Sequence, residues 1–359
     1  MLRFVARRLL LTVPVLIGIV AVVFLLARAI PGDPCRALLG ERATEEACVR
    51  FDQANGLDKP IPIQLGIYIG NLVRGNLGDS IRFSRPVSQL LVERLPMTIE
   101  LASAAMVIAI VVGIPLGIIS ARRHNSMVDV GTMAFANVGV SMPVFWLGLM
   151  LAYLFALVLK DTPFALPPSG RLTAGVVPVP FYVMWGWTIS EGTFRETGFE
   201  FLSNFAIFNS IITAQWEITG DAIKHLILPS LALSTIPTAI IARITRSSLL
   251  EVLGADYVRT ARAKGAQEQR VVTRHALRNA LFPVVTISGL QLGALLGGAV
   301  LTETVFGLAG VGRSLFEATT GRDYPIIQGF TVVIAVGYVL VNLLVDISYA
   351  YLDPRIRLQ

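Results

Sequence analysis

The sequence predicts an all-α membrane protein with six transmembrane helices, and two observations support this prediction. The first is composition: 54% of the 359 residues are hydrophobic and only 15% are charged, whereas a soluble domain carries about a quarter charged residues. The mean hydropathy is +0.68. The second is that the apolar residues gather into runs of the roughly 20 residues that a helix needs to cross a bilayer.

The predicted spans all consist of an apolar run of membrane length. In chain order they are Leu9–Ala29, Met97–Ala121, Val130–Leu159, His225–Ile244, Leu281–Val305 and Ile326–Leu352. The fourth is the weakest prediction because Pro229 and Pro237 interrupt it. Pro115 and Pro143 are expected to kink the second and third spans.

The first span has two features of a signal peptide. Arg3, Arg7 and Arg8 precede it, and Ala27-Arg28-Ala29 resembles a cleavage site. Its apolar stretch is longer than the roughly 7–15 residues of a signal sequence, which favours a helix that stays in the protein.

Positive charge predicts the orientation. Half of the 30 Lys and Arg residues lie in the short segments that a cytoplasmic N-terminus would place inside. The other half are spread over the outer segments, mostly in two long loops, residues 30–96 and 160–224. Because Lys and Arg concentrate in cytoplasmic loops, we expect both termini to be cytoplasmic. The Lys and Arg residues are not accompanied by a stripe of aromatic residues, as they are in surfaces that bind nucleic acid, so no nucleic-acid partner is expected.

The cysteines Cys35 and Cys48 are the only two in the chain, with twelve residues between them in the first outer loop. Outside the cytoplasm a disulfide can persist, so a disulfide and two free thiols both remain open. Two cysteines and three widely separated histidines do not make a zinc-type cluster, and no metal site is expected. Turn residues divide the same loop into one or two short helices near the membrane surface.

No enzyme motif is recognisable in the sequence. It contains no GxSxG elbow, no Walker A loop and no paired carboxylates within a predicted span, so neither a catalytic residue nor a bound cofactor is expected. Glu303 and Asp346 lie near span ends, where pairing with Arg or backbone, or reaching the interface, is the expected role. The alternative function is an ion-coupled secondary carrier or channel, which would place a charged or broken site at mid-membrane.

Glycines recur every four residues on two of the spans. Gly289, Gly293 and Gly297 form one stripe, and Gly113 and Gly117 form another. Small residues at this spacing allow close helix packing in lipid, and they are also compatible with lining a pore.

The basic segment 246–283 is predicted to form two short helices hinged at Gly265. The first covers about Ala255–Lys264 and the second about Gln267–Asn279. A short amphipathic helix needs a surface to fold against. From the residues alone, that surface could belong to a partner protein or to the lipid bilayer.

This segment resembles a known motif. Asp256-Tyr-Val-Arg-Thr-Ala-Arg-Ala-Lys-Gly265, followed by His275-Ala-Leu-Arg-Asn-Ala-Leu-Phe-Pro283, is similar to the EAA loop of binding-protein-dependent ABC importer permeases. The dipeptide/oligopeptide/nickel subclass is the most similar, because Arg259 and Thr260 depart from the general consensus as that subclass does. Further matches are Ile30-Pro-Gly-Asp-Pro34, Ser141-Met-Pro-Val-Phe-Trp146, Arg322-Asp-Tyr-Pro325 and Asp353-Pro-Arg-Ile-Arg357.

The resemblance implies a type I ABC importer permease fold in a prokaryotic inner membrane. It implies a first helix and outer loop over residues 1–95, a core domain over 96–352 and a cytoplasmic tail over 353–359. The implied partners are a second homologous permease subunit, two ATPase subunits that hold ATP and Mg²⁺, and an extracytoplasmic binding protein. Di- and oligopeptides are the leading substrates, with nickel chelates, glutathione and haem left open. The residues expected to couple to the ATPase are Ala255, Asp256, Tyr257, Arg259, Thr260, Ala261, Arg262, Ala263, Lys264 and Gly265.

Overall fold

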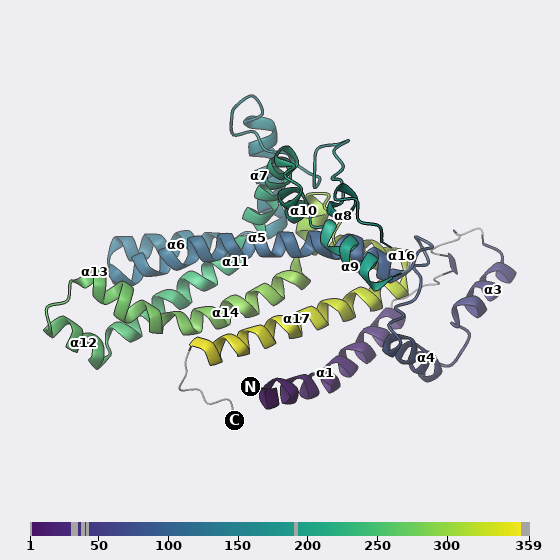
Figure 1. Cartoon of the computed structure of the whole chain (residues 1–359), viewed down its shortest axis with the longest axis horizontal. Coiled ribbons are helices and arrows are strands. Elements are labelled where there is room, and N and C mark those ends of the chain that lie inside the picture. Colours follow the sequence, from purple (N-terminus) through teal and green to yellow (C-terminus); the bar gives the residue numbers. More distant parts are fainter. Residues whose placement is uncertain (1, 30–34, 37–39, 41–42, 190–192, 353–359) are drawn as a thin grey trace.

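The computed structural model describes residues 2–29, 35–36, 40, 43–189 and 193–352. These residues form helices and no strand, which confirms the predicted all-α class. Long helices lie side by side along the long axis of the molecule (Figure 1). The longest are α1 (Leu2–Ala29), α5 (Val87–Arg122), α11 (Trp216–Leu253), α14 (Leu277–Gly298) and α17 (Tyr324–Leu352).

Shorter helices gather at the two ends of this bundle. We call these the α12 end and the α3 end (Figure 1). At the α12 end lie α12 (Asp256–Ala263), α13 (Glu268–Arg270) and the π-helical η2 (Val271–Ala276). Toward the α3 end lie α3 (Glu45–Asn55), α4 (Ile61–Val73), α8 (Phe181–Met184), α9 (Phe194–Ser203), α10 (Ala206–Ile212), α15 (Val300–Val305) and α16 (Val311–Gly321).

The third predicted span, Val130–Leu159, is present as two helical parts, and the kink expected at Pro143 is confirmed as a sharp bend. The structure has α6 (Met127–Ser141) followed by α7 (Val144–Ala152) and the π-helical η1 (Tyr153–Val158), with a bend of 97° between the two parts. Met142 precedes Pro143 and is extended, with φ −95° and ψ 133°, because the proline ring disfavours helical geometry in the residue before it. The arm 144–158 therefore leaves the bundle (Figure 1).

The fourth predicted span, His225–Ile244, was the weakest prediction and is confirmed. α11 has 38 residues and continues through both Pro229 and Pro237. Two thirds of its most apolar window is buried inside the protein. Neighbouring helices bury both prolines, and membrane helices tolerate proline where such neighbours surround them. Among the described residues, five helices are long and apolar enough to span a membrane, or six if the bent α6–α7 pair counts as one span.

Both glycine stripes lie at contacts between long helices. A Cβ at Gly117 of α5 would lie 2.5 Å from Cβ of Thr245 on α11, and one at Gly113 would lie 2.9 Å from the Thr238 carbonyl oxygen. A Cβ at Gly289 of α14 would lie 1.9 Å from Cγ2 of Val345 on α17. Side chains at these positions would separate the helices, so the glycines set the close packing of α5 with α11 and of α14 with α17.

Gly293 and Gly297 continue the second stripe along α14 with different amounts of room. A Cβ at Gly293 would lie 2.5 Å from the Tyr338 ring, whereas one at Gly297 would lie 3.8 Å from the nearest atom, on Ile334. α14 and α17 therefore pack closely at Gly289 and Gly293, and they leave more room at Gly297, toward the α3 end.

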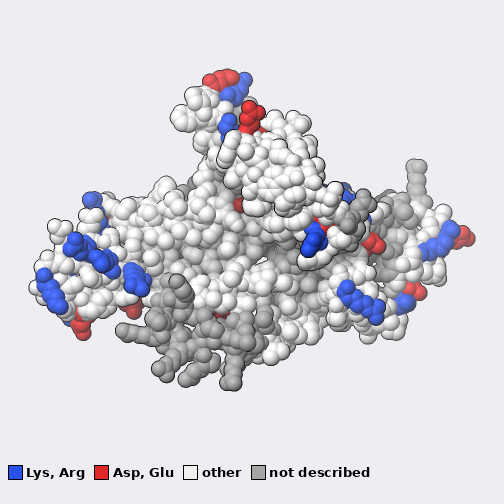
Figure 2. All heavy atoms as spheres, viewed as in Figure 1, with Lys and Arg blue, Asp and Glu red and all other residues white. Residues whose placement is uncertain are grey.

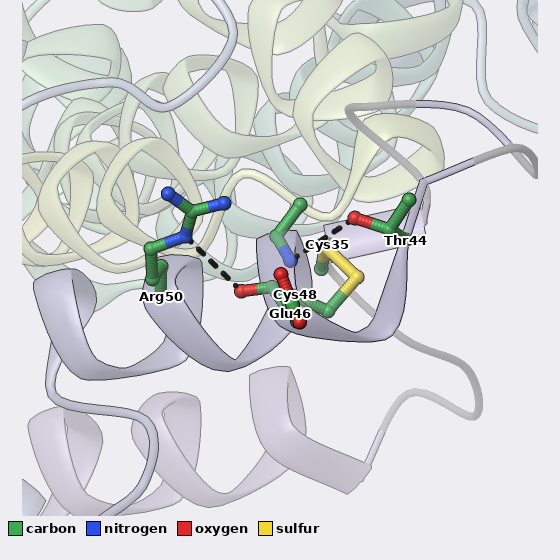
Figure 3. The surroundings of a disulfide bond; sticks show 6 residues. Cys35, Thr44, Glu46, Cys48 and Arg50 are labelled. Atoms are coloured by element: carbon green, nitrogen blue, oxygen red, sulfur yellow. Dashed lines mark hydrogen bonds between the residues drawn. A yellow bond between two sulfur atoms is a disulfide. The ribbon is translucent and has the colours of Figure 1, made fainter.

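At the α3 end, a disulfide joins Cys35 to Cys48, with a Cα–Cα distance of 5.4 Å. Figure 3 shows the bond at the first turns of α3. There the Thr44 hydroxyl accepts a hydrogen bond from the Ala47 amide at 3.3 Å, as an N-cap residue does. The disulfide therefore fixes the preceding chain to the start of this helix.

Candidate functional site

The α12 helix is bounded by turn residues on both sides. It follows α11 after Gly254, begins at Asp256 and ends at Ala263, with Lys264 at its C-cap. Gly265 then adopts φ +79°, a left-handed conformation that favours glycine because other residues carry a Cβ. The chain reverses there and enters α13. The predicted helix Ala255–Lys264 and the predicted turn at Gly265 correspond to this geometry.

One side of α12 is anchored and the other is exposed. The Val258 side chain is fully buried in a cluster of small and branched apolar residues. The cluster comprises Ala121, Leu249, Val258, Val271, Val272, Ala276 and Ala280. The side chains of Asp256 and Arg259 are 95% and 72% exposed, and Tyr257 is also exposed. The helix thus presents a polar surface at the extremity of the molecule (Figure 1).

Arg262 links the two helices that flank α12. Its Nε and Nη2 atoms donate to the Glu268 carboxylate at 3.1 and 2.7 Å, at the start of α13. Its Nη1 atom donates to the Leu253 carbonyl at 3.4 Å, at the end of α11. The hydrogen bonds to Glu268 raise the pKa of the Arg262 guanidinium above its ordinary value, so the charge is permanent.

Tyr257 supplies a second link. The Asn279 amide donates to the Tyr257 hydroxyl at 2.7 Å, and Asn279 belongs to α14. Both α11 and α14 are therefore hydrogen-bonded to the α12 segment.

The second predicted helix of the loop, Gln267–Asn279, is wrong as a separate element. α13, η2 and α14 follow each other without a break, and the segment Glu268–Gly297 is one membrane-length helix. Pro283 lies inside α14. The apolar side of the segment, which includes Val271 and Val272, packs on α12 and α11. It is covered within this chain and does not need an outside surface.

An ion pair that sequence reasoning missed lies beside this loop. Arg246 of α11 donates from Nε and Nη2 to the Asp129 carboxylate, at 2.7 Å each. The Ser120 hydroxyl of α5 donates to the same carboxylate. Asp129 is 4% exposed and lies in the first turn of α6, after its N-cap residue Ser126. The sequence pattern Ser126-x-x-Asp129, just before an apolar run, is the signal that places this carboxylate at the start of a helix.

The buried Glu303 caps α16. Its Oε1 accepts from the Thr98 hydroxyl at 2.7 Å and its Oε2 from the Arg313 amide at 2.9 Å. Helix N-termini favour carboxylates because their amides are unpaired and the helix dipole is positive there. Of the roles expected for Glu303, pairing with the backbone is the one in the structure.

Two further carboxylates in or near the spans are paired. Asp346 of α17 lies 3.0 Å from the Arg8 guanidinium of α1, which is the arginine pairing expected for it. Glu100 of α5, which sequence reasoning missed, accepts from Arg171 at 2.7 Å and from the Ile207 amide at 2.9 Å. These carboxylates therefore hold elements together.

Charge on the visible face lies at the two ends of the molecule and around the tip of the arm, while the side of the bundle is mostly uncharged (Figure 2). This distribution is expected of a membrane protein whose middle faces hydrocarbon.

Comparison with known proteins decides the family. Residues 113–358 match the family described as binding-protein-dependent transport system inner membrane component. Residues 1–102 match the N-terminal region of the same kind of component. The chain belongs to this family.

This inner-membrane permease is also similar over its whole length to individual relatives. It is 45% identical to the dipeptide transport system permease protein DppB of Alkalihalophilus pseudofirmus, over 99% of this chain and 100% of that protein. It is 44% identical to the di/tripeptide transport system permease protein DppB of Pseudomonas aeruginosa, over 100% of both chains. It is 43% identical to the dipeptide transport system permease protein DppB of Escherichia coli K12, over 99% of both chains. The boundary predicted between residues 95 and 96 stays a prediction.

Proposed function

We propose that this permease forms, with a second homologous permease subunit, the channel of an importer for di- and oligopeptides. Two separate ATPase subunits, which hold the ATP and Mg²⁺, bind at the α12 end. An extracytoplasmic binding protein delivers the peptide at the α3 end. Both termini are then cytoplasmic, and the Arg8–Asp346 pair between the first and last helices supports their lying on one side.

The observation that carries the coupling role is the construction of α12. Its polar surface is free for a partner, while Arg262 and Tyr257 attach the helix to α11 and α14. A movement of the ATPase subunits that displaces α12 therefore tilts membrane helices. Such a shift between two packed arrangements is how a binding event at one end opens or closes the other.

The substrate class is supported by the three relatives, whose names state dipeptide or di/tripeptide transport. The decisive measurement is uptake of a labelled dipeptide by the assembled system, with unlabelled tripeptide, nickel chelate, glutathione and haem as competitors. Competition by peptides alone supports the proposal, and competition by one of the other compounds alone contradicts it.

The coupling role is tested on the exposed surface of α12. We expect Arg259→Glu to lower binding-protein-stimulated ATP hydrolysis about tenfold, because a reversed charge in a docked interface costs several kcal/mol. The matched control is Arg123→Glu, which makes the same charge change on the exposed turn between α5 and α6. Normal ATP hydrolysis and uptake in Arg259→Glu, in a complex that assembles fully, would contradict the proposal.

A further inference from the structure

A cavity of about 260 Å³ opens near the α3 end. The end of α1, helix α4, the turn 76–81 and the first turns of α17 surround it. Figure 1 shows α4 beside the end of α1. The coupling surface at α12 lies at the opposite end of the molecule, so this cavity has no part in the coupling proposed for α12.

The cavity wall carries buried polar atoms without a partner. In the described part of the chain, seven buried side-chain nitrogen or oxygen atoms have no hydrogen-bond partner. Three of these atoms belong to residues that line this cavity: Arg28 Nη1, Tyr68 Oη and Gln328 Nε2. The Gln328 side chain is only 4% exposed. A buried polar group without a partner costs free energy, so a ligand that satisfied all three would be favoured here.

All three atoms can donate a hydrogen bond. Burial raises the pKa of the Tyr68 hydroxyl to about 12, so the hydroxyl keeps its proton. Arg28 is oriented by its neighbours: its Nε donates to Gln64 Oε1 at 2.7 Å and its guanidinium lies 3.5 Å from the centre of the Phe24 ring. Three donors, one of them cationic, match the oxygens of a phosphate or carboxylate.

The cation has no acidic partner among the described side chains. No carboxylate there lies within ion-pair distance of Arg28. Asp79, the acidic residue of the cavity lining, is exposed and outside that distance. A ligand with negative charge would therefore complete the site.

The position of the cavity indicates the source of the anion. Arg28 lies at the end of the first span, and Gln328 lies near the start of the last, so the cavity is at the depth of lipid headgroups. Helix α4 exposes Ile61, Ile63, Ile67 and Val73, which is typical of a helix lying on the membrane surface. Below the cavity, α1 exposes further apolar side chains, namely Val22, Leu25 and Leu26, along which acyl chains can lie.

We propose that this cavity binds the phosphate group of a phospholipid through Arg28, Tyr68 and Gln328. The bound headgroup joins α1 and α4 to the start of α17 and places the lipid chains along α1.

The test titrates phosphatidylglycerol into the purified, delipidated transporter complex. Lipid binding is followed by native mass spectrometry and by the Tm. We expect lipid to raise the Tm of the wild type, and Arg28→Gln to weaken the apparent affinity about tenfold or more, because it removes a charged donor. Arg74→Gln is the matched control, since Arg74 is an exposed arginine at the end of α4, and its lipid affinity should equal that of the wild type.

A second variant protects the test against misfolding of Arg28→Gln. Tyr68→Phe removes only the unpartnered hydroxyl, so without lipid it should be as stable as the wild type or more stable. With lipid it should show a several-fold weaker affinity. Unchanged lipid affinity in both Arg28→Gln and Tyr68→Phe would overturn the proposal.

Soluble anions distinguish the possible sources. Glycerol 3-phosphate and a dipeptide, each added to the delipidated complex, should stabilise it far less than phosphatidylglycerol does. If glycerol 3-phosphate or the dipeptide bound as tightly as the lipid, and bound more weakly to Tyr68→Phe, the cavity would be a site for a free anion and the lipid assignment would be overturned.

Discussion

The Arg246 guanidinium binds the Asp129 carboxylate through two hydrogen bonds of 2.7 Å, and so joins α11 to α6. The Ser120 hydroxyl brings α5 to the same carboxylate. The pair lies two turns before the end of α11, close to the α12 segment. A displacement of α12 that moves the end of α11 therefore also reaches α5 and α6.

Replacing Arg246 by Gln should destabilise the permease markedly. The Asp129 carboxylate is 4% exposed, and the loss of its partner leaves a buried charge uncompensated, at a cost of about 3 kcal/mol. We expect a lower Tm of the purified complex. The double variant Asp129→Asn/Arg246→Gln leaves no unpaired charge. Its Tm should fall by less than the sum of the decreases in the two single variants. If the decreases in Tm simply add, the pair does not act as a unit.

Replacing Arg262 by Gln should uncouple transport from ATP hydrolysis. The variant loses the bridge from α12 to Glu268 and to the Leu253 carbonyl, so α12 can move without moving its neighbours. We expect fewer peptides imported for each ATP hydrolysed, measured in proteoliposomes. Arg278→Gln is the control, because it removes an exposed arginine of α14 and leaves this bridge in place. If Arg262→Gln and Arg278→Gln import the same number of peptides for each ATP hydrolysed, the role of the Arg262 hydrogen bonds is contradicted.

Alanine should be harmful at Gly289 and harmless at Gly297. The added Cβ would lie 1.9 Å from Val345 Cγ2 in the first case and 3.8 Å from the nearest atom in the second. Overpacking of a core contact costs about 1–3 kcal/mol. A lower Tm for Gly289→Ala, with Gly297→Ala like the wild type, is the expected result. A lower Tm for Gly297→Ala than for Gly289→Ala would contradict the packing of α14 on α17 described above.

Glu303→Gln should weaken the attachment of α16. The carboxylate accepts hydrogen bonds from Thr98 and from the Arg313 amide, whereas an amide group would present N–H to one of these donors. We expect a loss of about 2 kcal/mol of stability and earlier proteolysis near α16. Glu217→Gln, at an exposed position of α11, should have the stability and the proteolysis pattern of the wild type. If Glu303→Gln gives the same stability and pattern as Glu217→Gln, the Glu303 carboxylate does not cap α16.

Removing the disulfide should make the chain between Cys35 and Cys48 more susceptible to protease. The bond closes a loop between residues 35 and 48, and a loop of this size stabilises the folded state by about 3 kcal/mol. In Cys35→Ser/Cys48→Ser, limited proteolysis should cleave between the two positions at a protease concentration that leaves the wild type intact. Identical cleavage with and without the bond would show that other contacts hold the segment.

Much of the fold could be predicted from the sequence because each span needs a long apolar run. The effect of each proline could be predicted only in part. Pro229 and Pro237 interrupt the hydrogen-bond pattern of α11, yet the helix continues because its neighbours cover it. The kink expected at Pro143 is confirmed, but its angle of 97° could not be predicted. The residue type is the same in each case, and tertiary packing decides the outcome.

The α12 segment could be located from its turn residues and its resemblance to a known motif. The contacts that attach it and the neighbouring end of α11 could not be predicted, because Tyr257 meets Asn279 and Arg246 meets Asp129 across 22 and 117 positions of the chain. Pairings of this kind depend on how helices are arranged, and the pattern within one helix does not contain that information.

The glycine contacts bring α5 close to α11, and α14 close to α17. At Gly113, Gly117 and Gly289 an added Cβ would lie within 3 Å of the facing helix, so these positions have no room for a methyl group. The α12 segment is hydrogen-bonded to one member of each pair, α11 and α14. If α12 moves as proposed, we therefore expect each of these two helices to move together with its closely packed neighbour.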